Sequence, residues 1–141
     1  MHRHWGKTLF NATWRLMEQE DRTAADDALM IHQAHASAYH WMMAGTPANV
    51  ARGHWQCSRV YCVVGRAEPA LYHARLVLET CREHGIGDWD LAFAYEALAR
   101  AYALAGDSEE ARRLVEQARL VEIAEDDDRE LLLADLETIP V

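Results

Sequence analysis

Apolar side chains recur every three or four residues along almost the whole chain, and no segment alternates between apolar and polar residues with a period of two. This spacing is typical of amphipathic α-helices that pack against a core. Divided at capping residues and glycines, the pattern predicts helices over 6–20, 25–44, 47–64, 67–84, 89–105, 108–123 and 127–136. The connections are short, so neighbouring helices are expected to be antiparallel. We therefore predict an all-α fold.

Residues that favour helix ends stand at the predicted boundaries. Thr23 and Asp26 form a capping-box pattern, in which each side chain bonds to the backbone N–H of the other residue. Thr46 and Pro47 fit the N-cap and the first position of the next helix. Glycine favours helix ends, and it closes four of the predicted helices: Gly45, Gly65, Gly85 and Gly106. The helix boundaries are thus specified locally.

The length of 141 residues suits one domain with a single core, and no Pro-, Gly- or Ser-rich linker divides residues 1–141. Half of the residues are hydrophobic, which argues against a disordered chain. No run reaches the roughly 20 apolar residues that cross a bilayer, and the N-terminus has no signal-peptide pattern. The chain has three cysteines and no CxxC motif, so a cytoplasmic protein without disulfides is expected.

The net charge of −9 is concentrated in the C-terminal part of the chain. Residues 1–60 carry six basic and five acidic side chains, whereas residues 61–141 carry eight basic and eighteen acidic ones. Binding to nucleic acid needs clustered positive charge that displaces counterions from phosphates, and no such cluster is present. An anionic membrane surface would repel the acidic part. We therefore expect neither nucleic acid nor a membrane as a partner.

An internal repeat with a period of 41 residues lies within the helical pattern. Shifting the first copy by this period gives identical residues at five pairs of positions: Ala51/Ala92, Arg59/Arg100, Tyr61/Tyr102, Gly65/Gly106 and Ala70/Ala111. We interpret residues 47–84 and 88–123 as two copies of one helical hairpin.

This hairpin resembles the tetratricopeptide repeat, which combines a small residue, an aromatic residue three positions later, a turn glycine and an alanine in the second helix. The second copy carries the pattern best, at Tyr95, Leu98, Ala99, Tyr102, Gly106, Asp107, Ala111 and Ala118. In the first copy, His54 and Cys57 stand where large apolar residues are usual. The resemblance, shared with bacterial proteins of this repeat type, implies a short right-handed α-α superhelix. Residues 6–44 would form a degenerate hairpin in it, and residues 127–136 a capping helix.

The resemblance also implies where a partner binds, because the first helix of each such hairpin lines the concave side of the stack. Six residues of the two clear hairpins are candidates there: Arg52, Trp55, Arg59, Phe93, Glu96 and Arg100. Arg59 and Arg100 occupy equivalent positions and should stand on adjacent helices about 8–10 Å apart. Their repulsion, about 2 kcal/mol at a dielectric of about 20, calls for a nearby anion.

The sequence leaves two interpretations of this anion open. Glu96 lies four residues before Arg100 and can form a helical ion pair, so these side chains could satisfy one another. Alternatively, the arginines bind a carboxylate or phosphate of a peptide or metabolite, between apolar walls formed by Trp55 and Phe93.

Three histidines lie on the helix predicted over 25–44, and two of them, His32 and His35, share one helical face. Such a pair could chelate a metal ion, but no Asp, Glu, His or Cys stands at the neighbouring positions 28, 36 or 39. We therefore expect no metal and no cofactor, with His32 and His35 as a minor alternative. His35 is also a candidate for the floor of the binding site, where it would respond to the charge of a ligand.

Two hypotheses for the function follow. A non-catalytic binding module would recognise a peptide or partner protein along the Arg/aromatic-lined concave face, in keeping with the absence of Walker, GxGxxG and HExxH motifs. The alternative is a small anionic-ligand pocket or a modest enzyme, with His35 or Glu96 as the acid/base group and the arginines as anion holders. A homodimer through an exposed hairpin face is a further arrangement that the sequence allows.

Overall fold

The computed structural model describes all 141 residues and contains seven α-helices and no β-strand. The helices are α1 (His2–Met17), α2 (Ala24–Ala44), α3 (Pro47–Val63), α4 (Ala67–His84), α5 (Asp88–Leu104), α6 (Ser108–Leu120) and α7 (Asp126–Glu137). The predicted all-α fold is confirmed, and each predicted helix is present with ends shifted by a few residues.

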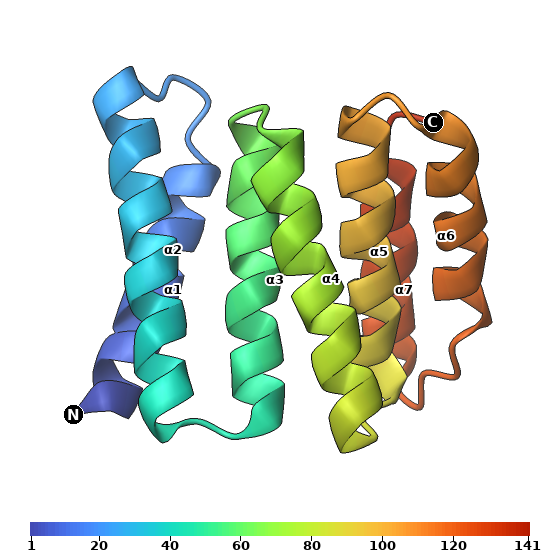
Figure 1. The fold of residues 1–141 in the computed structure, drawn as a ribbon, viewed down its shortest axis with the longest axis horizontal. Coiled ribbons are helices and arrows are strands. Elements are labelled where there is room, and N and C mark those ends of the chain that lie inside the picture. Colours follow the sequence, from blue (N-terminus) through green and yellow to red (C-terminus); the bar gives the residue numbers. More distant parts are fainter.

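Consecutive helices pack as the hairpins α1/α2, α3/α4 and α5/α6, which stand side by side (Figure 1). The hairpins are joined because α2 also packs against α3, and α4 against α5. In addition, α1 contacts α3, α3 contacts α5, and α5 contacts α7. We call the four helices that these contacts connect, α1, α3, α5 and α7, the odd-helix layer.

Local capping explains where several helices begin and end. The side chains of Thr23 and Asp26 each accept the backbone N–H of the other residue, which completes the predicted capping box of α2. Thr46 and Asn49 begin α3 in the same way, with Pro47 at the first helical position. Three helix-closing glycines adopt left-handed φ values, of +79° at Gly65, +64° at Gly85 and +89° at Gly106. A side chain would strain these turns.

Helix α1 begins at His2, earlier than the predicted start at residue 6. A contact with α2 lies at this added end, where Nδ1 of His2 is 2.7 Å from Nδ1 of His40. Further along α1, Ser37 of α2 donates to the carbonyl of Gly6 at 2.7 Å, and Gln56 of α3 donates to another α1 carbonyl at 2.9 Å. Gly6 permits the close approach, since a Cβ there would lie 2.8 Å from the indole of Trp41. The added turn of α1 thus has tertiary contacts, which helical periodicity does not report.

The C-terminal helix α7 packs against α5 and lies behind it in Figure 1. Leu132 and Leu136 of α7, together with Ile139, are buried in the main hydrophobic core around α5. This packing covers α5 side chains in the odd-helix layer, where the candidate site lies. In the whole chain, no helix combines the length and hydrophobicity that a membrane crossing requires.

Candidate functional site

The two arginines at equivalent repeat positions lie side by side and share one carboxylate. Arg59 Nη1 donates to Glu96 Oε1 at 3.3 Å, and Arg100 Nε donates to Oε2 of the same carboxylate at 3.2 Å. The pair between Glu96 and Arg100 is thus present along α5, and Arg59 reaches the same group from α3. The negative charge of Glu96 therefore offsets the repulsion between the two arginine cations.

A second carboxylate, from Asp135 of α7, completes this cluster. Its two oxygens accept hydrogen bonds from Arg59 at 3.2 and 3.0 Å. Arg100 Nη2 donates to the backbone carbonyl of Asp135 at 3.0 Å and to Thr138 Oγ1 at 2.7 Å. The space among Arg59, Glu96 and Arg100 is too small for a water molecule. We call Arg59, Glu96, Arg100 and Asp135 the arginine network. Their contacts support the interpretation that the charged side chains satisfy one another rather than bind a ligand.

Glu96, a candidate for lining the concave side, is instead buried: its side chain is 0% exposed where α7 packs against α5. Burial raises the pKa of the Glu96 carboxyl, and the charges of Arg100 and Arg59 oppose this rise. For Arg59, burial acts to lower the pKa, but the hydrogen bond to Asp135 and the charge of Glu96 outweigh it, so the pKa is raised. An enclosed carboxylate held by two arginines has no access to a substrate, so we assign Glu96 no acid/base role.

Beside the arginine network, the odd-helix layer contains a pocket of about 480 Å³. This volume lies within the range of about 300–1,000 Å³ that is usual for ligand sites. Five aromatic side chains from three helices line what we call the aromatic pocket: Phe10 and Trp14 of α1, Trp55 of α3, and Trp89 and Phe93 of α5. Three of the candidate residues, Arg52, Trp55 and Phe93, are therefore part of this pocket.

Trp55 links the aromatic side chains of the pocket. Its ring stacks on that of Trp14, with centroids 5.8 Å apart, and meets the edge of Phe93 at 6.0 Å. The indole N–H of Trp55 is buried without a hydrogen-bond partner. Buried polar groups normally have a hydrogen-bond partner, so packing within the chain does not explain this unpaired donor on a residue of the pocket wall.

One charged side chain of the pocket has no ion-pair partner, and this side chain is acidic. Arg52 donates to both carboxylate oxygens of Asp90 at 3.0 Å, and its guanidinium lies 4.3 Å from the ring centroid of Trp89. Asp135 also lines the pocket but belongs to the arginine network. Asp128, in the first turn of α7, takes part in none of the ion pairs. The pocket therefore favours a cation over an anion.

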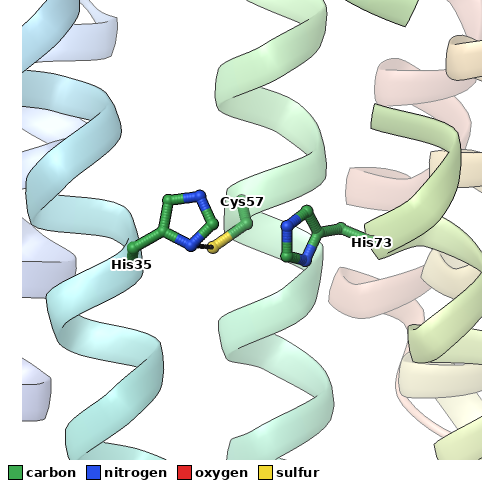
Figure 2. Close-up of side chains that lie close together, drawn as sticks. All are labelled: His35, Cys57 and His73. Carbon is green, nitrogen blue, oxygen red and sulfur yellow. Dashed lines mark hydrogen bonds between the residues drawn. The ribbon is translucent and has the colours of Figure 1, made fainter. Parts of the chain in front are cut away.

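His35, predicted for the floor of the binding site, does not line the aromatic pocket. It projects from α2 toward α3, and Figure 2 shows its imidazole on one side of the sulfur of Cys57, with the imidazole of His73 on the other. His32 is exposed and is not part of this group. The spacing along α2 places His32 and His35 on one helical face, but only His35 lies beside Cys57 and His73.

Around Cys57 lies what we call the histidine cluster (His35, His54, Cys57, Tyr61 and His73). Burial is the main cause of lowered pKa values at His35 and His54. Burial, reinforced by the charges of His54 and His35, lowers the pKa of His73 to about 4. Burial also raises the pKa of the Cys57 thiol to about 12. Each of these shifts favours the uncharged form of its side chain.

Sequence reasoning missed the outer walls of the aromatic pocket. Phe10 and Trp14 lie in the segment interpreted as a degenerate hairpin, and Asp128 and Asp135 lie in the helix interpreted as a cap. The five tryptophans of the chain were a usable signal, because three of them line the pocket. No local signal could place Asp135 beside Arg59, since 76 residues separate them.

Comparison with known proteins gives no family model, no curated protein and no solved structure that matches this chain. The geometry of the aromatic pocket and its surroundings is therefore the basis for a proposed function.

Proposed function

We propose that the chain is a tetratricopeptide-like stack of helical hairpins that acts as a non-catalytic binding module, and that its aromatic pocket receives a basic side chain of a partner peptide. The observation that carries the proposal is a pocket of about 480 Å³ with five aromatic side chains and the unmatched carboxylate of Asp128 in its lining. A cation over the face of such a ring is attracted by the ring quadrupole, an effect of about 0.5–2 kcal/mol.

Equivalent features in the two copies of the hairpin support the stacked arrangement. Gly65 and Gly106 both have left-handed φ values at the hairpin turn. Ser58 and Ala99 are both buried at the small-residue position of the first helix. These pairs are each 41 residues apart, as the repeat requires. Peptide binding along the layer of first helices is what the resemblance to tetratricopeptide repeats implies.

The charges disfavour the alternative of an anionic ligand held by the arginines. Arg52, Arg59 and Arg100 each hold a carboxylate already. An incoming anion would have to displace one of these carboxylates and would also be repelled by Asp128. A cationic group meets neither obstacle, because the arginines are neutralised by their partners.

Tryptophan fluorescence offers a direct test, since three pocket residues are tryptophans: Trp14, Trp55 and Trp89. Blocked tripeptides of the form Gly-X-Gly, in which X is Arg, Lys, Leu or Glu, would be titrated into the full chain. We expect saturable changes with the Arg and Lys peptides, a weaker response with Leu and none with Glu. Tighter binding of the Glu peptide than of the Arg peptide, or no saturable binding at millimolar concentrations, contradicts the proposal.

Variants locate the binding. Trp55→Ala should abolish the response to the Arg peptide, and Asp128→Asn should weaken that peptide about 2–5-fold while leaving the Leu peptide unchanged. Trp5→Ala is the matched control, because Trp5 is a 45% exposed tryptophan of α1 outside the pocket. All variants would first be compared with the unmodified chain by circular dichroism. Unchanged binding in folded Trp55→Ala argues against the aromatic pocket as the site.

A further inference from the structure

Outside the aromatic pocket, the histidine cluster brings three metal-ligating side chains from three helices to one point. His35 of α2 and His73 of α4 flank the sulfur of Cys57 on α3 (Figure 2). One donor atom of each residue lies within 4.8 Å of the other two, and the Sγ of Cys57 is 3.9 Å from Nδ1 of His35. Cys57 is 1% and His73 is 9% exposed. Packed helices therefore hold these donors close together.

The second ring nitrogen of each imidazole already has a partner. Nε2 of His35 lies 2.8 Å from the hydroxyl of Tyr61, and Nδ1 of His73 lies 3.1 Å from Nδ1 of His54. Nδ1 of His35 and Nε2 of His73 are therefore the nitrogens left for a ligand near Cys57. Metal-binding histidines almost always have such a partner on the other nitrogen, because it fixes the tautomer and the orientation of the ring.

The second hairpin shows what ordinary packing uses at the same positions. Leu98 and Leu114 stand 41 residues after Cys57 and His73, and both leucines are buried. A buried imidazole loses hydration, a cost that leucine does not have. No carboxylate forms an ion pair with a histidine of the cluster. Packing alone does not explain why the first hairpin has nitrogen and sulfur donors here.

We propose that His35, Cys57 and His73 bind one Zn²⁺ ion, with a water molecule as the fourth ligand. Imidazole nitrogen and thiolate sulfur are ligands that zinc prefers, at about 2.0–2.1 and 2.3 Å, which in a tetrahedral site places the donor atoms roughly 3.4–3.6 Å apart. The donor atoms now lie within 4.8 Å of one another, so side-chain rotations that move them by about 1 Å complete the site. His35 is only half-buried, which gives the ion a route from solvent.

The binding step is a proton exchange without oxidation or reduction. The S–H bond of Cys57 breaks, its electron pair forms the S–Zn bond, and the proton passes to the solvent buffer. The two imidazoles bind through nitrogen lone pairs and release no proton. The step therefore releases one proton for each zinc ion bound.

Calorimetric titration of the metal-free full chain with ZnCl₂ near neutral pH tests the proposal, in two buffers that differ in ionisation enthalpy. We expect one zinc ion per chain and about one proton released. In a parallel titration, Co²⁺ in place of Zn²⁺ should give a thiolate-to-cobalt charge-transfer band. Absence of saturable heat with ZnCl₂, or of this band in the cobalt complex, overturns the proposal.

Substitutions then identify the ligands. Cys57→Leu and His73→Leu copy the residues of the second hairpin, and each should weaken zinc binding by roughly 100-fold or more. Tyr61→Phe, which removes the partner of His35, should weaken it about 10-fold. Should a leucine variant fail to fold, the nearly isosteric Cys57→Ser keeps the test decisive, because it must lose the charge-transfer band. Retention of the band in Cys57→Ser overturns the proposal.

A second histidine pair supplies the control for binding elsewhere. The Nδ1 atoms of His2 and His40 are 2.7 Å apart, so this pair could take up added zinc. His40→Ala, and Cys81→Ala at another buried cysteine, should leave the affinity, the stoichiometry and the cobalt band unchanged. Zinc binding that is lost in His40→Ala but kept in Cys57→Ser places the ion at the terminal pair and overturns the proposal.

Discussion

Replacing Asp135 by asparagine tests how the C-terminal helix is held on the rest of the molecule. The substitution removes a charge and keeps the volume of the side chain. Arg59 then loses its bridge to two carboxylate oxygens at 3.0 and 3.2 Å. Both arginines of the network are left with Glu96 as their one carboxylate. We expect a loss of unfolding free energy of about 2–3 kcal/mol.

This magnitude follows from the burial of the pair. Exposed ion pairs contribute about 0–1 kcal/mol, whereas removing one partner of a buried pair costs about 3–5 kcal/mol. The side chains of Arg59 and Asp135 are 16% and 21% exposed, so the pair lies nearer to the buried limit. Asparagine keeps one oxygen that can accept a hydrogen bond from Arg59, which places the expected loss below the full cost.

Urea unfolding of the full chain measures the change, provided that the m-value stays constant. Glu116→Gln is the matched control, because its ion pair with Arg119 is largely exposed and should contribute no more than about 0.5 kcal/mol. Arg59→Met and the double variant complete a cycle, in which we expect a coupling of about 1–3 kcal/mol. A loss in Asp135→Asn no larger than in the control, or strict additivity in the cycle, refutes the reasoning.

Two further predictions concern the helix framework. Gly53→Val should destabilise the fold by about 1–3 kcal/mol, because a Cβ at this position would lie 3.2 Å from the Cα of Ala38, where α2 and α3 approach closely. An unchanged melting temperature by circular dichroism would show that the two helices can separate at little cost. Thr46→Ala should lower the unfolding free energy by about 1 kcal/mol, because it removes the oxygen that accepts the backbone N–H of Asn49 at 3.3 Å. The control Thr8→Ala, at an exposed position of α1, should cause no loss in the same urea assay.

The positions of the helices could be predicted because their ends are specified by neighbouring residues. Thr46, Pro47 and Asn49 act within a single turn, so the start of α3 can be found without any knowledge of the fold. The start of α1 could not be found in this way. Its first turn contacts α2 through His2 and His40, which are 38 residues apart.

The candidate site was predictable only where both partners lie within the repeat. Glu96 and Arg100 are four residues apart, and the period of the repeat places Arg59 beside them. The pairing with Asp135 comes from α7, whose packing no repeat position specifies. For the histidine cluster, the departures from the repeat pattern at His54 and Cys57 were a visible signal. The contribution of α2 to that cluster lies outside the two aligned copies.

Helix α3 supplies residues to both the aromatic pocket and the histidine cluster, and its geometry predicts that the two sites act independently. At about 100° per residue, Trp55 and Cys57 point roughly 160° apart around the helix axis. Side chains on opposite sides of one helix share no partner, so substitutions at these two positions should have additive effects on stability. An effect of ZnCl₂ on the affinity for the Arg tripeptide would therefore require α3 to move as a rigid body. Fluorescence titrations with and without ZnCl₂ measure that coupling directly, and equal affinities are the expected result.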